Sequence, residues 1–339
     1  MNVAPIWLTE AEVVSLMDMG EAVVAIERGL AAEATASAST MLKTHLAFQD
    51  GELHAIGGQL GVDGLAGTKT WLHTSGGVTP LLVLYDTEDG SLRAVIEAFV
   101  LGQYRTAAIS GVATARLAAA DASQLAIIGT GKQALTQAAA VVAVRPIEGI
   151  RIYGRNRERR VAFANKVADA FGLPTVSAES AAEAVDGADV VTLITRATEP
   201  VVPADAITRG THVNAVGAIS LERAEFDPKL LARCSVVAAD SPAQTRRLSS
   251  EFLDYYGTDD AAWQEVRPLS ELVAARSVRP PDSDVTLFKA MGIGLADVAL
   301  GAFCEAQARI NGIGTPLGQP QRSRPRLRSS LKQPGVGYV

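Results

Sequence analysis

Three small residues at fixed spacing, Gly129, Gly131 and Ala134, follow the apolar run 124–128 and could bind the pyrophosphate of a dinucleotide. Gly129 would permit a sharp turn, and Gly131 would let the backbone approach a phosphate because it has no Cβ. Ala134 stands where the following helix would pack closely on the strand. Amides at the start of that helix would point at the anion, and the helix dipole would favour its charge. The predicted site also includes Thr130, Lys132 and Gln133.

The sequence around this motif predicts the sheet that would hold it. After residue 120, short runs rich in β-branched residues are separated by helix-like or turn-rich segments. Strand alternating with helix is typical of an α/β fold with a Rossmann-type, doubly wound parallel sheet, buried on both faces. The predicted strands are 124–128, 149–153, 189–195, 212–216 and 235–239, with helices over 132–144 and 159–171.

The end of the second predicted strand carries information about the cofactor. A carboxylate there would bind the ribose hydroxyls of NAD, but this chain has Gly154 and Arg155, with Arg157 two residues further on. A guanidinium suits a 2′-phosphate, so the sequence favours NADP(H) over NAD(H). The alternative is that both arginines only solvate the following helix. The predicted cofactor contacts extend to Asn156, Thr195, Val216 and Gly217.

Length and composition bound the class of protein. The chain has 339 residues, enough for two domains, and it is 48% hydrophobic and 20% charged, as in ordinary globular proteins. Its net charge of −6 argues against nucleic-acid binding. Cys234 and Cys304 have no metal-ligand or disulfide spacing, so no metal site is predicted. The N-terminus does not resemble a signal peptide and no apolar run is long enough to span a bilayer, which favours a cytoplasmic enzyme without membrane contact.

The region before the glycine motif has a different character. Thr9 and Glu12 form a capping-box pattern that predicts the start of a helix. A glycine-punctuated, strand-like pattern follows, and it includes the two arms of one hairpin. The predicted elements are a helix over 19–34, strands within 41–97, hairpin arms at 81–85 and 91–96, and a helix over 104–120.

The last part of the chain returns to helix and then changes composition. Residues 286–299 are expected to lead into a helix that runs to about Ile310. Beyond Gly312 the sequence is rich in Gln, Ser, Pro and Arg. Such a composition predicts a basic, disordered tail over 316–339. Its basic residues include Arg322, Arg324, Arg326, Arg328 and Lys332.

Taken together, these motifs resemble the ornithine cyclodeaminase/mu-crystallin family. The most specific combination is the Tyr-Arg-Thr-Ala-Ala run at 104–108 ahead of the glycine motif. Other matching runs lie at 67–71, 86–91, 213–218 and 288–292, the last followed by Asp297. The resemblance covers roughly residues 5–312. It implies a homodimer with a discontinuous α+β substrate-binding and dimerisation domain over 1–120 and 290–315, and an NAD(P)-binding domain inserted at 121–289.

The family's substrates are small amino or imino acids, whose carboxylate needs fixed positive charge in a partly closed site. The resemblance implies that Arg105 and Lys69 are the catalytic residues and bind this carboxylate together with Lys43. Lys69 is also a candidate proton donor, since a desolvated lysine beside another cation has a lowered pKa. Asp297 matches a family position without a settled role, and Glu225 matches one that we expect to be structural.

One departure from the family distinguishes its branches. In the cyclodeaminases the segment after Asn-Ala-Val-Gly carries an aspartate that acts on the substrate's amino group, and here Ile219 takes that place. Isoleucine can neither take a proton nor hold an ammonium group, so ornithine cyclodeamination is disfavoured. Ile56 and Gly57 replace a common Met-Pro, and the loop 73–77 lacks the usual asparagine, which points to an unusual substrate.

The sequence therefore predicts an NAD(P)H-dependent reductase or dehydrogenase acting on a C=N bond, or on an amino group, next to a carboxylate. A cyclic ketimine reductase and an amino-acid dehydrogenase both fit this description. Two alternatives stay open. One is an ornithine cyclodeaminase-type ammonia lyase, and the other is a non-catalytic, crystallin-like protein that binds NADPH or another ligand.

Overall fold

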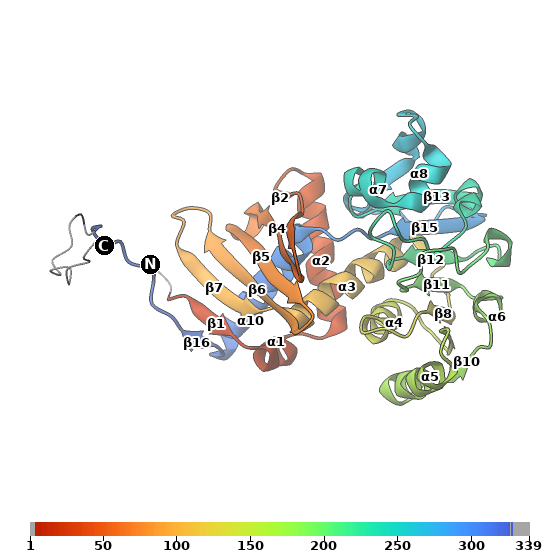
Figure 1. Cartoon of the computed structure of the whole chain (residues 1–339), viewed down its shortest axis with the longest axis horizontal. Helices are drawn as coiled ribbons and strands as arrows, with labels where there is room; N and C mark the ends of the chain where they lie inside the picture. Colours follow the sequence, from red (N-terminus) through yellow and green to blue (C-terminus); the bar gives the residue numbers. More distant parts are fainter. Residues whose placement is uncertain (1–3, 326, 328–339) are drawn as a thin grey trace, which may run out of the picture.

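The computed structural model describes residues 4–325 and 327, and within them the chain forms two β-sheets that stand side by side (Figure 1). Sheet A has the strand order β16-β1-β7-β6-β5-β4-β2, with β3 paired to β4. It is mixed, since β1 runs parallel to β7 while the pairs from β4 to β7 are antiparallel. Its strands are β1 (Ile6–Leu8), β2 (Ala38–Thr40), β3 (Thr44–Phe48), β4 (Gly51–Leu60), β5 (Leu65–Thr74), β6 (Gly77–Asp86), β7 (Leu92–Glu97) and β16 (Thr315–Pro316), with the short helix η1 (Gly61–Asp63) before β5.

In the described part of the chain, helices cover only one face of sheet A. The long helix α10 (Gly294–Asn311) packs on β4, β5 and β6, with α1 (Glu10–Leu16), α2 (Met19–Ala34) and α3 (Phe99–Leu117) around it. Gly301 brings α10 so close to the sheet that an added Cβ would meet Leu82. The predicted capping box of Thr9 and Glu12 is confirmed, and so are the bounds of α2. The predicted hairpin arms are β6 and β7.

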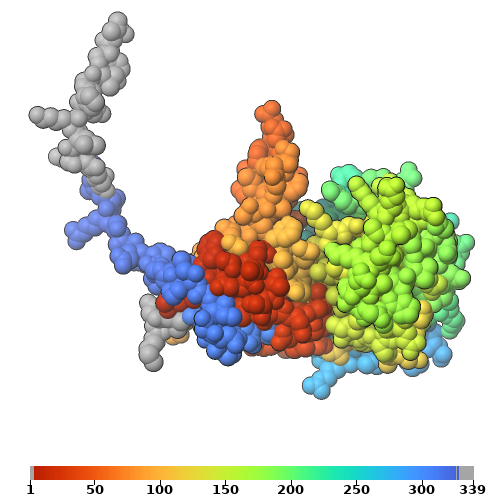
Figure 2. Space-filling view, turned by 90° about the horizontal axis from the view of Figure 1, so that it is seen from below, coloured from red at the N-terminus to blue at the C-terminus, as the bar shows by residue number. Residues whose placement is uncertain are grey.

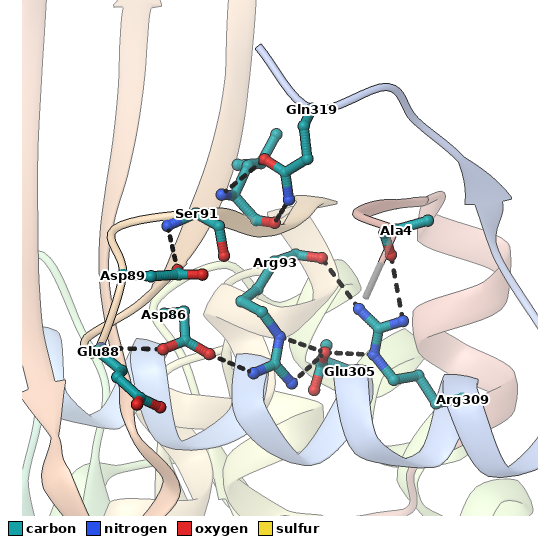
Figure 3. A network of polar contacts seen from close by, with 10 residues as sticks. Ala4, Asp86, Glu88, Asp89, Ser91, Arg93, Glu305, Arg309 and Gln319 are labelled. Atoms are coloured by element: carbon teal, nitrogen blue, oxygen red, sulfur yellow. Dashed lines mark hydrogen bonds and ion pairs between the residues drawn. The ribbon is translucent and has the colours of Figure 1, made fainter. Parts of the chain in front are cut away.

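A polar network ties the two ends of the chain to this hairpin (Figure 3). Arg93 on β7 contacts Asp86 and Glu305, while Arg309 on α10 donates to the carbonyls of Ala4 and Arg93. The side chain of Gln319 donates to and accepts from the backbone of Leu92. Ends far apart in sequence are thereby joined into one unit.

The expectation of a disordered tail from residue 316 needs correction at its start. Pro316 pairs with Ile6 in β16, and the amide of Leu317 donates to the carbonyl of Pro5 at 2.7 Å, because β1 offers a free edge for these residues. Residues 320–325 and 327 follow without helix or strand. The rest of that expectation, which concerns 326 and 328–339, lies outside the described residues.

Sheet B is parallel and has the order β10-β9-β8-β11-β12-β15-β13-β14. One central strand, β15 (Val285–Lys289), is a correction, because we expected only the approach to a helix there. Its residues are fully buried, so they show no alternating pattern that would distinguish a strand from a buried helix. The other strands are β8 (Gln124–Ile128), β9 (Gly149–Tyr153), β10 (Thr175–Ser177), β11 (Val190–Leu193), β12 (His212–Ala215), β13 (Cys234–Ala239) and β14 (Val266–Pro268).

Both faces of sheet B are buried, as predicted for a doubly wound fold. Successive residues of β8 point to opposite faces and show this. Ile127 packs in a hydrophobic cluster with α4 and α5, while Ile128 packs in a second hydrophobic cluster with α6 and α8. The α/β fold with a Rossmann-type parallel sheet is confirmed. The helices are α4 (Ala134–Val142), α5 (Arg157–Phe171), α6 (Ala181–Val185), α7 (Pro242–Leu248), α8 (Ser250–Tyr256) and α9 (Leu269–Ala274), with η2 (Ala204–Ala206), η3 (Pro228–Arg233) and η4 (Ala262–Glu265).

Candidate active site

The two predicted catalytic residues, Lys69 and Arg105, meet at the buried carboxylate of Asp297. Nζ of Lys69 donates to Oδ1 of Asp297 at 2.5 Å, and Nε of Arg105 lies 3.5 Å from the same oxygen. Asp297 has no exposed surface and Lys69 is 4% exposed. Oδ2 of Asp297 and Nε of Arg105 are buried and have no hydrogen-bond partner among the described residues. Buried polar atoms are normally paired, so these two atoms are available to a ligand.

The local sequence explains why Asp297 lies over Lys69. Lys69 on β5 faces the helix side of sheet A, with Ile56 of β4 as its neighbour in register. Gly57 and Gly294 touch backbone to backbone, because a Cβ on Gly294 would lie 2.1 Å from the carbonyl oxygen of Gly57. The first turn of α10 is therefore pressed onto β4. An aspartate there also benefits from the positive end of the helix dipole.

Arg105 is held from the side of sheet B. Its guanidinium packs on Gly292, whose φ is +87° and whose added Cβ would lie 2.8 Å from the guanidinium nitrogen Nη1. Only glycine combines this backbone conformation with such an approach. Asp240, after β13, fixes the loop by accepting from the amides of Met291 at 2.8 Å and Gly292 at 2.7 Å. Gly292 follows β15, so Arg105 sits at the carboxyl edge of sheet B.

Lys43 joins this group, as the sequence predicted, from the segment between β2 and β3. Its Nζ lies 5.9 Å from the ring centroid of Trp71, and Nζ of Lys69 lies 5.3 Å from the same ring. Burial lowers the pKa of both lysines, and the neighbouring Arg105 lowers each of them further. The carboxylate of Asp297 raises the pKa of Lys69 and so opposes these effects. Lys69 and Arg105 therefore meet at one buried carboxylate, and Lys43 lies close enough to lower the pKa of Lys69 as well.

The glycine motif forms the expected turn between β8 and α4. Gly129 has φ +124°, and a Cβ there would lie 2.4 Å from the carbonyl oxygen of Ile194. A Cβ on Gly131 would meet nothing within 4 Å, which leaves the space that a phosphate needs. Oε1 of Gln133 is buried and has no partner among the described residues, and Lys132 is exposed. The open space at Gly131 and the cationic Lys132 fit a dinucleotide pyrophosphate, whereas the Gln133 oxygen suits a hydroxyl donor such as ribose.

The turn after β9 has no room for an acidic side chain at its first position. A Cβ on Gly154 would lie 2.9 Å from Cγ2 of Thr130. Arg155 is exposed, and Arg157, which is 80% exposed, lies 4.0 Å from Glu179. Asn156 accepts from the amide of Arg159 and so caps α5, a role that the sequence analysis did not assign to it.

The loops after β11 and β12 are tied together by a buried residue, Glu225. Its carboxylate accepts from the amide of Thr195 at 2.6 Å, from the amide of Gly217 at 2.6 Å and from the amide of Ala218 at 2.9 Å. The hydroxyl of Thr195 donates to it as well, at 2.9 Å. Val216 is buried in the core, so a cofactor could meet only its backbone. Sequence analysis had treated Glu225 as merely structural, and the contacts show which loops it organises.

All of these loops belong to one edge of the molecule. In a parallel sheet the carboxyl ends of the strands lie together, and ligands bind where the strand order reverses, here at β8 and β11. The glycine motif, Thr195, Gly217 and Gly292 follow four neighbouring strands at this edge. Because Arg105 packs on Gly292, the group of Lys43, Lys69 and Arg105, here called the cationic cluster, lies at the same edge of sheet B as the predicted nucleotide site.

Sequence reasoning missed some of the residues that complete the site. The role of Asp297 could not be assigned because its partners lie far away in the sequence, and Asp240 carried no signal. His212 is buried and bonded to Thr286 and Asn214, as expected for a structural histidine. Among the described residues, no three metal-ligating side chains lie together, Cys234 and Cys304 are free, and no helix is long and apolar enough to cross a membrane.

Proteins of known activity are similar to this chain in sequence and in structure. A Delta(1)-pyrroline-2-carboxylate reductase of Bacillus cereus is 31% identical over 245 residues, which are 71% of this chain and 74% of the relative. Thermococcus litoralis Delta(1)-pyrroline-2-carboxylate reductase, solved in complex with NADH and L-proline, superposes with a TM-score of 0.85 and 27% identity, covering 92% of this chain and all of that one. An archaeal alanine dehydrogenase dimer with bound NAD gives a TM-score of 0.84 and 28% identity over 93% and 99% of the two chains.

The family resemblance seen in the sequence is confirmed over almost the whole chain. The sequence model of the ornithine cyclodeaminase/mu-crystallin family matches residues 4–309, which include sheet B, sheet A except for β16, and the cationic cluster. The chain belongs to the ornithine cyclodeaminase/mu-crystallin family.

Proposed function

We propose that this protein is an NAD(P)H-dependent reductase or dehydrogenase that acts on a C=N bond, or in reverse on an amino group, next to a carboxylate. The observation that carries the proposal is the meeting of Lys69, Arg105 and Asp297 at the edge of sheet B where the glycine motif lies. The reductases and the dehydrogenase to which the chain is similar act on small imino or amino acids, which supports the same substrate class here.

Within this site, Arg105 and Lys69 bind the substrate carboxylate, and Lys43 adds a further positive charge. A buried carboxylate loses its hydration, and charge-assisted hydrogen bonds from these groups offset that loss. Asp297 keeps Lys69 charged and oriented by accepting its hydrogen bond. Burial lowers the pKa of Lys69, which makes its ammonium group a better proton donor. In this proposal it gives that proton to the imine nitrogen beside the bound carboxylate.

The residues of the nucleotide site fit a dinucleotide cofactor. The open space at Gly131 suits a phosphate, and Oε1 of Gln133, which has no partner among the described residues, suits a ribose hydroxyl. A bound nicotinamide supplies the hydride for the imine carbon, or accepts it in the reverse direction. Gly129 to Ala134, Arg155 to Arg157, Thr195, Val216 and Gly217 are the residues we propose to hold it. Glu225 fixes the last of these loops through its backbone contacts.

We further propose that the protein prefers NADP(H) to NAD(H). The acidic side chain that would bind the ribose hydroxyls of NAD is absent, and the contact of Gly154 with Thr130 leaves no space for it. Arg155 is exposed at the adjacent position and free to meet a 2′-phosphate. The solved relatives bind NADH or NAD, so this preference would distinguish the chain from them.

The assembly we propose is a homodimer formed through the uncovered face of sheet A. On that face Leu46, Leu53 and Leu72 lie in one cross-strand row and are 64%, 46% and 44% exposed. An apolar sheet face of this kind normally packs against a partner. Under this proposal, 1–120 with 290–315 form the substrate-binding and dimerisation domain and 121–289 form the nucleotide-binding domain.

Sedimentation velocity tests the dimer. Leu53→Glu should produce monomers, whereas Val24→Glu, at an apolar position of α2 that is 66% exposed, should not. A dimer that survives Leu53→Glu would contradict the proposed interface.

A substrate panel tests the proposed reaction. NADPH and NADH oxidation would be followed at the nicotinamide absorbance with cyclic imino acids and with keto acids plus amines. Ammonia release from L-ornithine would be measured in parallel. Turnover of an imine is the expected result. Release of ammonia without net cofactor oxidation would contradict it and would favour the lyase alternative, despite Ile219.

A further inference from the structure

A row of three aromatic side chains crosses the helix-facing side of sheet A beside the cationic cluster. His45 on β3, His54 on β4 and Trp71 on β5 are neighbours in register. The rings of His54 and Trp71 stack with centroids 4.7 Å apart and an interplanar angle of 15°, and His45 lies 5.8 Å from His54. We call these residues the aromatic row. Nothing in the proposed binding of the carboxylate uses it.

The aromatic row begins where the cationic cluster ends. His54 and Trp71 are two residues along their strands from Ile56 and Lys69, which is about 7 Å on the same face. The ammonium groups of Lys43 and Lys69 lie 5.9 Å and 5.3 Å from the Trp71 ring. A carboxylate bound by these lysines would therefore place the rest of its molecule over the row.

The aromatic row is open to a ligand. Trp71 and His54 are half-buried and His45 is exposed, and the strands that carry them project from the body of the protein (Figure 2). Nδ1 of His54 is buried and has no partner among the described residues. The other ring nitrogen, Nε2, lies 3.0 Å from the carboxylate of Glu52.

The charges around the row select against a cationic side chain. Lys43, Lys69 and Arg105 outnumber Asp297, and Glu52 on the outer side is already engaged by His54. Burial and the nearby Lys43 lower the pKa of His54 and outweigh the opposing effect of Glu52, which favours the uncharged ring and its π face. Flat apolar rings stack well on such faces, whereas an ammonium or guanidinium group would be repelled by the lysines.

We propose that the aromatic row is the subsite for the substrate's side chain, and that it selects imino acids carrying an uncharged, flat ring. This inference rests on the proposed function, because it assumes that the carboxylate is bound by Lys69 and Arg105. It identifies His54 and Trp71 as specificity-determining residues. Diamino acids such as ornithine are excluded by charge, independently of Ile219.

Imines formed from methylamine and three keto acids test the subsite. Phenylpyruvate carries a flat ring, pyruvate only a methyl group, and 5-guanidino-2-oxopentanoate a cation. We expect kcat/KM for the phenylpyruvate imine to exceed that for the pyruvate imine by about tenfold, with the cationic substrate lowest. Trp71→Ala should lower kcat/KM for the phenylpyruvate imine more than for the pyruvate imine, and should so abolish the tenfold advantage.

Matched variants separate recognition from folding. Trp71→Phe should retain most of the advantage because it keeps a ring, and Thr70→Ala, at the exposed neighbouring position of β5, should leave it unchanged. His54→Ala should reduce it as Trp71→Ala does. If Trp71→Ala fails to fold, as judged by thermal melting, His54→Ala and Trp71→Phe still test whether the aromatic row selects a flat ring.

Binding measurements keep this inference apart from the proposed reaction. Calorimetry would compare phenylpyruvate with pyruvate on the NADP-loaded protein. Tighter binding of phenylpyruvate that depends on Trp71, without turnover of any imine, would support the subsite and overturn the proposed reaction. Imine turnover with equal kcat/KM for all three side chains, or an equal loss for all of them in Trp71→Ala, would overturn the subsite.

Discussion

Lys69 and Asp297 are 228 residues apart in sequence, yet Nζ of the lysine lies 2.5 Å from Oδ1 of the aspartate in a buried contact. Arg105 approaches the same carboxylate oxygen from a third element, α3. Removing one partner of a buried ion pair typically costs about 3–5 kcal/mol, because it leaves an uncompensated charge. The pair therefore couples the stability of the site to the protonation of Lys69.

The alkaline limb of the pH–activity profile should report this coupling. Burial lowers the pKa of Lys69, so kcat/KM for an imine should fall at a pH below the ordinary lysine value of 10.5 as the ammonium group deprotonates. Asp297 raises the pKa, so Asp297→Asn should move this limb to still lower pH. Asp86→Asn, which alters the distant pair with Arg93, should leave it in place. An unchanged limb in Asp297→Asn would show that Lys69 does not control it.

Gly292 should matter for substrate binding through its contact with Arg105. In Gly292→Ala the added Cβ would displace the guanidinium, and we expect KM for the imine to rise about tenfold, with little change in the Kd of NADPH. Gly210→Ala is the matched control, because Gly210 has φ +96° but nothing within 4 Å of an added Cβ. Both variants should lose about 1–3 kcal/mol of unfolding free energy from backbone strain. Equal KM values in Gly292→Ala and Gly210→Ala would show that the contact between Gly292 and Arg105 does not contribute to substrate binding.

Arg155 should set the cofactor preference. Arg155→Ala is expected to weaken NADPH binding by about 1–3 kcal/mol, the usual value for a charge-assisted hydrogen bond, and to leave NADH binding almost unchanged. Fluorescence titration of both cofactors measures the difference. Arg159→Ala, another exposed arginine two residues into α5, serves as the control. Parallel losses for NADPH and NADH would contradict the proposed preference.

Glu225 should be required for cofactor binding although it is buried beneath the loops. Glu225→Gln replaces one acceptor oxygen by an amide group that faces the amides of Thr195 and Gly217. We expect a lower melting temperature and roughly tenfold weaker NADPH binding, as for the loss of a hydrogen bond to a charged group. Glu222→Gln, at an exposed neighbouring position, should change neither. Normal NADPH binding in Glu225→Gln would reduce its role to that of a core residue.

His212 should make the fold sensitive to acid. Burial lowers its pKa from 6.5 to about 3, so between these values the unfolded chain binds a proton that the folded chain excludes. The unfolding free energy should fall as the pH drops from 6.5 towards 3, with a contribution of about 4 kcal/mol from this group. Denaturant titrations should show a shallower decline for His212→Gln than for His73→Gln, which alters an exposed histidine. The same slope in both variants would refute the assignment.

Much of the fold could be predicted from local pattern. The capping box of Thr9 and Glu12, the helix 19–34, the hairpin at 81–96 and most strands of sheet B carry their signals within a few neighbouring residues. The glycine motif was equally local, since Gly129 needs its backbone conformation whatever lies around it. In contrast, β15 is buried on both faces, so its sequence lacks the alternation that reveals a strand.

The candidate site likewise has a part that the sequence predicts and a part that only the tertiary structure shows. The family resemblance pointed to Lys69, Arg105 and Lys43, and their residue type agreed with it because a partly enclosed carboxylate needs fixed positive charge. The sequence could not show that Asp297 is the shared anion, that Glu225 joins two loops, or that His54 stacks on Trp71. Those relationships depend on strand register and on how α10 packs against β4. Such long-range contacts are decided only when the whole chain has folded, since no short segment contains both partners.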